Sequence, residues 1–179
     1  MIKHSKIFEN MTKESKNFTV QIFNESQLKA SELIVVAPDH HGLFSLISGL
    51  VSSSGYDVVN AKIITRSDGY ALDTFFIQNN KKEPIIENHL KTKLINIMHR
   101  GLEGNYNIEE ALNIRWSQIP IRYRAIKAPA RVRIDNITSN DYTVLEIKCK
   151  NAPGVLYRIT KIITDLGLQI NTASVSSYG

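Results

Sequence analysis

Residues 33–78, LIVVAPDHHGLFSLISGLVSSSGYDVVNAKIITRSDGYALDTFFIQ, form the stretch that decides the fold. Residues 33–37 are a short apolar run stopped by Pro38, a pattern that predicts a buried strand. The apolar side chains that follow recur at helical spacing until Gly55, where a left-handed residue typically ends a helix. Those apolar positions are Leu43, Phe44, Ile47, Leu50 and Val51. The stretch therefore begins as strand, loop and helix.

The second half of this stretch predicts a β-hairpin. Residues 58–65 are rich in β-branched side chains, residues 68–69 are an Asp-Gly hairpin signal, and residues 70–78 supply a further strand. The apolar spacing in the first of these strands breaks the period of two by one residue. This break predicts a β-bulge near residues 59–60.

The chain repeats the pattern 112 residues later without a gap. The shift places Gly42 on Gly154 and Gly55 on Gly167, so both glycines that bound the helix recur. The apolar helix positions recur as Val155, Leu156, Ile159, Ile162 and Ile163. A helical pattern that returns together with both bounding glycines predicts an internal duplication, and so a tandem of one small domain.

The remaining elements follow from the same periodicities. We expect further strands at residues 18–23, 131–137, 142–150 and 168–177, and helices at 84–101 (beginning at Pro84), 108–116 and 155–166. The predicted division is an N-terminal polar segment (1–17), a first unit (18–100), a basic linker (101–130) and a second unit (131–179).

The element order predicts an α+β, ferredoxin-like sandwich of βαββαβ type with strand order 4-1-3-2. In that order the third strand lies between the first two. Up to residue 179 the second unit has no counterpart of residues 70–78, so its strands at 142–150 and 168–177 would face a gap with unpaired backbone groups. We therefore expect one full unit plus a C-terminally truncated second unit that needs a strand from another chain.

Composition narrows the class of protein. The chain of 179 residues is 42% hydrophobic and 22% charged, as is ordinary for a soluble globular protein. No apolar run approaches the roughly 18 residues of a membrane span, and no signal-peptide core is evident, so we expect no membrane partner and a cytoplasmic location. The single cysteine, Cys149, suits a reducing compartment. Because Cys149 falls opposite Ala37 in the repeat, we expect it to fill a small buried strand position.

Two segments carry a resemblance to a known family. Residues 38–78 contain Pro38-Asp39 before Gly42-Leu43-Phe44, followed by Asp68-Gly69 and the run Ala71-Leu72-Asp73-Thr74-Phe75. Residues 131–179 contain Ile134-Asp135-Asn136 and an Asp-Tyr-Thr-Val segment. Together these resemble the two ACT domains at the C-terminal end of the bacterial bifunctional uridylyltransferase/uridylyl-removing enzyme, which acts on the PII signal protein. The resemblance covers nearly the whole chain from Phe18 onward.

The departures from that family concern catalysis. The family enzyme carries a nucleotidyltransferase domain with a Gly-Ser and an Asp-x-Asp pair, and a metal-dependent His-Asp hydrolase domain. Neither motif occurs in this sequence. The resemblance therefore implies a fragment without catalytic residues or cofactors. The letters Asp39-His40-His41 could suggest a metal site, but paired histidines at a turn are more often solvated or capping residues, and we expect no metal.

A ligand site is predicted at the loop that precedes the first helix. In this family the ACT domains are taken to sense glutamine, which the resemblance implies as the effector. The free N–H groups at a helix start attract a carboxylate, and Gly42 lets the backbone come close to a ligand. Asp39 could meet the ammonium group of an amino acid, and Asn60 could recognise its side-chain amide. Singly, each residue is better explained by a turn, a cap or a bulge, and it is the resemblance that favours a ligand site for the loop as a whole. The candidate ligand-binding residues are Asp39, His40, His41, Gly42, Leu43, Phe44 and Asn60, with Asn151, Gly154, Val155 and Leu156 in the second copy.

Four functions compete at this point. The first is a regulatory module for nitrogen metabolism that senses an amino acid. The second is a structural remnant that binds no small molecule and pairs with other ACT units, or with itself as a homo-oligomer. A third is RNA binding, which the net charge of +5 and the βαββαβ topology would suit. The predicted third strand lacks the aromatic RNA-binding segment, so we expect no nucleic acid partner. The fourth, an active enzyme, is disfavoured by the missing motifs.

Overall fold

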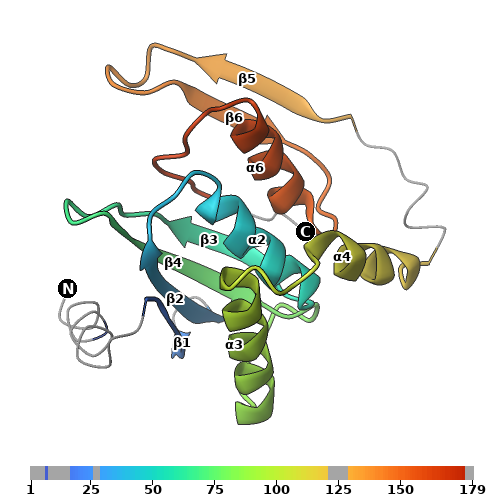
Figure 1. Ribbon diagram of the computed structural model, residues 1–179. Coiled ribbons are helices and arrows are strands. Elements are labelled where there is room, and N and C mark those ends of the chain that lie inside the picture. The colour runs from blue at the N-terminus through green and yellow to red at the C-terminus, as the bar shows by residue number, and fades with distance from the viewer. Residues whose placement is uncertain (1–6, 8–16, 26–28, 121–128, 176–179) are drawn as a thin grey trace.

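The computed structural model describes residues 7, 17–25, 29–120 and 129–175 of the chain (Figure 1). Most of the predicted N-terminal polar segment (1–17) therefore lies outside the described residues. So do residues 121–128 of the predicted basic linker (101–130). Within the described part, no helix is long and apolar enough to cross a membrane.

A four-stranded antiparallel sheet forms the centre of the first unit. Its strands are β1 (Thr19–Glu25), β2 (Ala30–Pro38), β3 (Asp57–Lys62) and β4 (Tyr70–Gln78), in the order β1-β2-β4-β3. The sequence predicted that the third strand of the unit lies between the first two. This is confirmed, because β4 lies between β2 and β3. The edge position beside β2 is filled by β1, which precedes β2 in the chain, because β1 and β2 form an antiparallel hairpin from Thr19 paired with Val36 to Glu25 paired with Ala30.

The predicted bulge and hairpin are confirmed in β3 and β4. The register between these strands shifts between Val58 and Asn60, which is the one-residue break that the apolar spacing required. The connecting turn has Gly69 at φ +82°, a left-handed conformation that glycine adopts without strain. β3 is shorter than predicted, because it ends at Lys62 and only Thr65 forms a further isolated bridge, to Ala71.

Three helices, α2 (Leu43–Ser53), α3 (Asn88–Leu102) and α4 (Ile108–Ser117), belong to the first unit and the segment after it. They enclose one main hydrophobic core with the inner face of the sheet (Figure 1). The most deeply buried members of that core include Leu33, Ile47, Leu50, Phe75, Leu94 and Met98. The helix predicted to begin at Pro84 begins instead at Asn88, because Ile85 is buried in the core in an irregular segment and its N–H donates to Ser31 Oγ at 2.8 Å.

The second unit is a smaller assembly. Its strands β5 (Arg131–Asp135) and β6 (Val144–Lys148) form a two-stranded antiparallel sheet, and α6 (Val155–Asp165) follows. The register is the same as that of the β1–β2 hairpin under the shift of 112, since Arg131 pairs with Lys148 as Thr19 pairs with Val36. The two helices also occupy matching residues.

Two predictions for the second unit were wrong. Residues 168–175 form no strand, and 176–177 lie outside the described residues. Cys149 is exposed, whereas its counterpart Ala37 is buried. Both errors have the same cause. Among the described residues no strand corresponds to β4 in the second unit, so neither segment has the neighbour against which it would pair or pack.

The two units meet through an antiparallel pair of helices, α2 and α6 (Figure 1). At one end of the pair, the Gly154 N–H donates to Ser52 Oγ at 2.6 Å. At the other end, Gly42 lies against Thr164, whose Cγ2 would be 3.0 Å from a Cβ at position 42. The shift of 112 carries Gly42 onto Gly154 and Ser52 onto Thr164. The two units are therefore packed with approximate two-fold symmetry.

Candidate functional site

The predicted ligand loop lines a small cavity between the two units. Residues 39–45 of the first unit face the end of α6 and the segment after it, and the cavity has a volume of about 40 Å³. From the second unit it is lined by Thr164, Leu168, Gln169 and Ile170. Of the residues predicted for the first copy, Asp39, His40, His41, Gly42, Leu43 and Phe44 all border this cavity.

Asp39 is held in place at the cavity by two contacts. Its carboxylate accepts a hydrogen bond from Thr65 Oγ1 at 2.9 Å, and its backbone N–H donates to the Gly69 carbonyl at 2.8 Å. Both partners belong to the β3–β4 connection, and Thr65 lies 26 positions after Asp39 in the chain. The hairpin turn thus fixes the position of the acidic side chain.

Gly42 adopts the left-handed conformation at the start of α2, with φ +86°. The helix has no side-chain cap there and no acidic residue in its first turn. The first N–H groups of a helix have no partners within the helix, so this end of α2 can receive a negatively charged group. The tight turn itself is closed by the Leu43 N–H, which donates to the His40 carbonyl at 3.1 Å.

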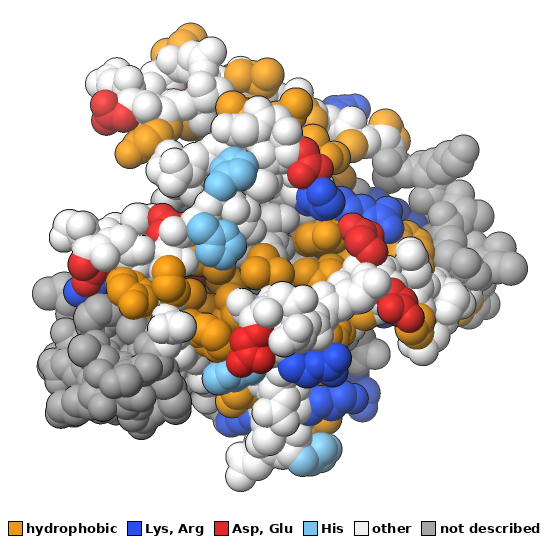
Figure 2. Space-filling model, viewed as in Figure 1, with side chains coloured by type: hydrophobic (Ala, Val, Ile, Leu, Met, Phe, Trp, Pro, Cys, Tyr) orange, Lys and Arg blue, Asp and Glu red, His pale blue; other side chains and the backbone are white. Residues whose placement is uncertain are grey.

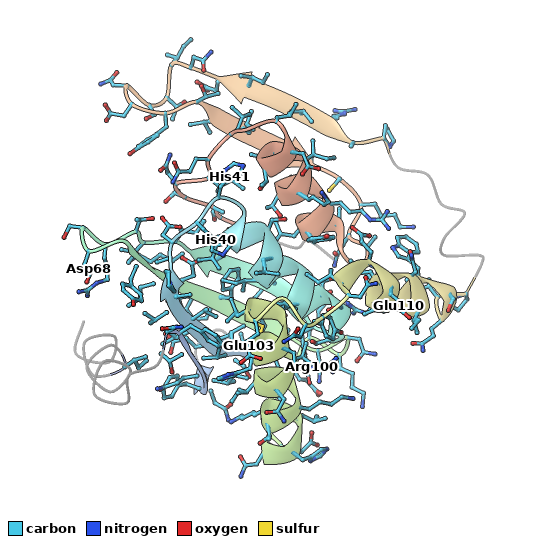
Figure 3. The ribbon with its side chains drawn as sticks, viewed as in Figure 1. His40, His41, Asp68, Arg100, Glu103 and Glu110 are labelled. Atoms are coloured by element: carbon cyan, nitrogen blue, oxygen red, sulfur yellow. The ribbon has the colours of Figure 1, made fainter. Side chains whose placement is uncertain are left out.

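The two histidines have different neighbours (Figure 3). The His40 ring lies 3.1 Å from the carbonyl oxygen of the adjacent His41. The His41 Nε2 lies 2.8 Å from the Thr164 carbonyl oxygen at the end of α6, a bond in which His41 is the donor. His41 therefore links the ligand loop directly to the second unit. No group of three or more histidine, cysteine or acidic residues placed to hold a metal ion occurs among the described residues.

Asn60 does not border the cavity. It is exposed on β3, at the bulge, opposite Phe76. The residues of the β3 side that do reach the cavity are Ile63 and Thr65. The bulge predicted from the sequence is correct, but the structure does not bring Asn60 together with the loop residues.

The loop of the second copy lies at the opposite end of the helix pair. Gly154 starts α6 in the left-handed conformation at φ +76°, and the Val155 N–H donates to the Ala152 carbonyl, repeating the turn of the first copy. Asn151 is exposed, while Gly154 is buried beside Leu112 of α4. Val155 and Leu156 are half-buried.

The contacts at this second end involve Arg115 of α4. Its guanidinium donates to the Ser52 carbonyl and lies 3.8 Å from Asp57. Burial raises the pKa of Asp57, while Arg115 and a hydrogen bond from Asn151 act in the opposite direction. Arg115 thus binds the end of α2 as His41 binds the end of α6, and in the second loop Asn151 and the Gly154 N–H both have protein partners.

Asp73 is the acidic residue of the cavity that the sequence analysis did not select. It lies on β4 opposite Val35, on the face of the sheet that the helices cover, and only 1% of it is exposed. Its Oδ1 has no hydrogen-bond partner among the described residues. Burial, reinforced by the charge of Asp39, raises the pKa of Asp73 to about 7, although a hydrogen bond from the Ile64 backbone acts in the opposite direction. A lone acid between Leu72 and Thr74-Phe75, inside an otherwise apolar strand, was the available signal.

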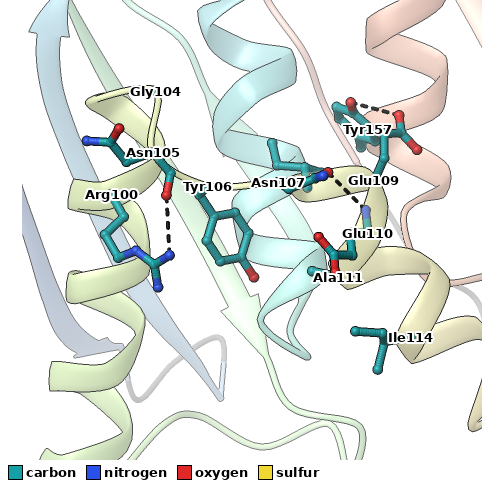
Figure 4. Close-up of a pocket in the computed structure, with 11 residues that line it drawn as sticks. Arg100, Gly104, Asn105, Tyr106, Asn107, Glu109, Glu110, Ala111, Ile114 and Tyr157 are labelled. Atoms are coloured by element: carbon teal, nitrogen blue, oxygen red, sulfur yellow. Dashed lines mark hydrogen bonds between the residues drawn. The ribbon is translucent and has the colours of Figure 1, made fainter.

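A larger, open groove of about 780 Å³ lies between α3, α4 and α6 (Figure 4). Several of its polar groups already have partners. Asn107 caps α4 by accepting from the Glu110 N–H at 3.1 Å, and the Tyr157 hydroxyl donates to Glu109 at 3.0 Å. Arg100 lies over the Tyr106 ring and donates to the Asn105 carbonyl. Since these groups are already paired, the groove is a weaker candidate for recognition than the cavity at Asp73.

The chain is similar to known proteins along almost its whole length. A family model described as "ACR9-like, ACT-like domain" matches residues 131–178. Bifunctional uridylyltransferase/uridylyl-removing enzymes from Rhodospirillum rubrum, Gluconobacter oxydans and Azospirillum brasilense are 34%, 33% and 32% identical to the chain, in each case over 99% of it. The chain belongs to the ACT-domain region of this enzyme family. It spans about a fifth of these relatives, 19% of the length of each. No solved structure matches the chain.

Membership in this family agrees with the architecture. The α+β fold with ferredoxin-like elements is the one expected for ACT domains, and the region of the enzymes that matches this chain is a regulatory one. The cavity at the loop 39–45 lies where the two units of this fold meet.

Proposed function

We propose that this chain is a cytoplasmic amino-acid-sensing module of nitrogen regulation, built from two copies of one ACT unit. The observation that carries the proposal is the cavity shared by the first unit's ligand loop and the end of α6 in the second unit. A ligand at this position touches both units. Its binding free energy can therefore alter how the units pack, which is the physical basis of a regulatory response.

Glutamine is the effector that best fits the loop. The uncapped start of α2 suits the α-carboxylate, and the acidic residues of the cavity suit the α-ammonium group. A second carboxylate, as in glutamate, would be repelled by Asp39. The neutral side-chain amide of glutamine avoids that repulsion while still donating and accepting hydrogen bonds.

Titration calorimetry with glutamine and glutamate tests this proposal. We expect Gly42→Val to abolish binding, because a branched side chain at φ +86° strains the turn and its Cβ presses on Thr164. Asp39→Ala should weaken binding by roughly 1–3 kcal/mol, as expected for loss of a charged hydrogen bond. Gly104→Val is the matched control, since Gly104 has φ +78° and no atom near its Cβ position. Equal glutamine affinity in wild type and Gly42→Val would exclude this loop as the site.

We further propose that the chain is not itself an enzyme. The relatives are named for uridylyl transfer and removal, but the chain corresponds to only 19% of their length. The purified chain should neither transfer uridylyl groups to the PII signal protein nor remove them. Incorporation of labelled UMP above that of a mock-purified control would contradict this assignment.

An interaction module that binds no small molecule is the second candidate. It is favoured by the apolar side chains exposed around β5 and β6 (Figure 2), such as Val132, Ile134 and Tyr142. A two-stranded sheet with open edges tends to pair with another chain. Light scattering at roughly tens of micromolar protein should then show self-association. A monomer that binds glutamine would favour the sensing module, and an oligomer that binds no amino acid would favour this candidate.

A further inference from the structure

Asp73 is a carboxyl group placed where the sheet would otherwise be apolar. Its neighbours along the same face of β4 are Ala71 and Phe75, both of which belong to the main core. Phe75 stacks on Phe44 of α2 with 5.3 Å between ring centroids. A polar atom buried in such surroundings is costly unless it is hydrogen-bonded, yet Asp73 Oδ1 has no partner in the described part of the chain.

No lysine or arginine side chain lines the cavity to pair with Asp73 among the described residues. The titratable lining residues of the cavity are Asp39 and Asp73, with His40 and His41. Asp39 already accepts from Thr65, and His41 already donates to the second unit. The group that would complete the site is therefore a compact cation with several N–H donors.

The size of the cavity sets how much of a ligand it can hold. About 10–15 Å³ is needed for one water molecule, and the cavity measures about 40 Å³. An ammonium group is of water size and fits, whereas a whole amino acid does not. The rest of the molecule has to lie toward the first turn of α2 and the end of α6, where the His41 bond to the Thr164 carbonyl now closes the gap between the units.

We propose that Asp73 is a ligand-binding residue that receives the primary ammonium group of the effector and releases its own proton to solvent as that group enters. The inference rests on the proposed amino-acid-sensing function and assigns the deepest contact of its site. Burial and the nearby Asp39 favour the neutral carboxyl group while the cavity is empty. An incoming ammonium group reverses that preference, because a paired carboxylate beside a cation is favoured over a neutral acid.

Calorimetry with two ligands isolates this contact. Glutamine is compared with glutaramic acid, which keeps the carboxylate and the amide but lacks the α-ammonium group, for wild type, Asp73→Asn and Asp68→Asn. Asp68 is an exposed acid of the β3–β4 turn paired with Arg66 and serves as the matched control. Wild type and the control should prefer glutamine by about tenfold or more, and Asp73→Asn should lose that preference while keeping its affinity for glutaramic acid.

Proton release gives a second readout on the unmodified chain. At about pH 6, the heat of glutamine binding should differ between phosphate and Tris buffers by the heat of a released proton, and Asp73→Asn should remove the difference. Carboxyl-carbon NMR of wild type should show the Asp73 signal moving from its protonated to its ionised position on adding glutamine.

The outcomes separate the two proposals. Absence of any amino-acid binding by wild type would remove the sensing function and this inference with it. Binding of glutamine with an unchanged Asp73 carboxyl signal, or an Asp73→Asn variant that weakens both ligands equally, would overturn the role of Asp73 and leave the sensing function standing.

Discussion

The hairpins β1–β2 and β5–β6 have the same register and opposite burial. Val20 is 6% exposed and its counterpart Val132 is 62% exposed, while Leu33 is fully buried and its counterpart Leu145 is 38% exposed. The side chains are of the same type in both hairpins. The difference arises because β2 is flanked by β4 on its other side, whereas no described strand flanks β6. Local pattern therefore sets strand pairing, and the surrounding layers set burial.

The largest expected effect comes from truncating the matched leucines of the two units. Leu33→Ala should lower the free energy of unfolding by about 2–5 kcal/mol, because it leaves a cavity in a closed core. Leu145→Ala should change it by only about 0.5 kcal/mol, as for a half-exposed side chain. Urea unfolding followed by circular dichroism measures both. Similar losses would mean that the second unit has a closed core as well.

One contribution to the pH dependence of stability should come from Asp73 of the first unit, since its strand β4 has no described counterpart in the second unit. Asp73 holds its proton more tightly in the folded than in the unfolded state. The stabilisation is therefore complete below the ordinary pKa of 3.8 and is lost as the pH rises through about 7. The free energy of unfolding should fall by at most about 1.4 kcal/mol per pH unit across that interval.

Unfolding titrations at several pH values measure this slope. Asp73→Asn should reduce the slope by the contribution of this one group. Asp165→Asn is the control from the second unit, where the acid is exposed and paired with Lys161. A slope that Asp73→Asn leaves unchanged would show that other groups govern the pH response.

Filling the contact between the units should give an intermediate effect. A Cβ on Gly49 would lie 2.7 Å from Tyr157 and 2.9 Å from Ile108, so Gly49→Ala overpacks the helix pair by about 1–3 kcal/mol. Part of this is offset by the better helix propensity of alanine, about 0.5–1 kcal/mol. The corresponding residue in α6 is the exposed Lys161, and Lys161→Ala should be close to neutral. Urea unfolding of the two variants compares the packed and the open face directly.

The smallest effect is expected at the polar link between the loop and α6. His41→Ala removes the donor to the Thr164 carbonyl and should cost about 0.5–1.5 kcal/mol. His40→Ala is the adjacent control, since the His40 ring forms its hydrogen bond with the carbonyl of the neighbouring residue and not with α6. Amide hydrogen exchange at the end of α6 should increase for His41→Ala and not for His40→Ala. Equal exchange in both would show that the link does not hold α6.

The sequence alone determined the features that depend on a few neighbouring residues. The left-handed glycines at 55 and 167, the helices that end before them, and the bulge in β3 all follow from backbone preference and side-chain period. The loop turns are even closed by matching bonds, from Leu43 to His40 and from Val155 to Ala152. The loop residues 39–44 of the candidate site were selected in advance because of the family resemblance that their motif carries.

The tertiary structure decided which of these features are buried and what they face. The exposure of Cys149, the irregular segment after Gly167 and the packing of α2 on α6 depend on strands and helices distant in the chain. Asp73 entered the candidate site only because β4 lies beneath the start of α2, and Asn60 left it because the bulge lies away from the loop. Side-chain period fixes which face of a strand a residue occupies, but the neighbour that covers that face is set by contacts remote in sequence.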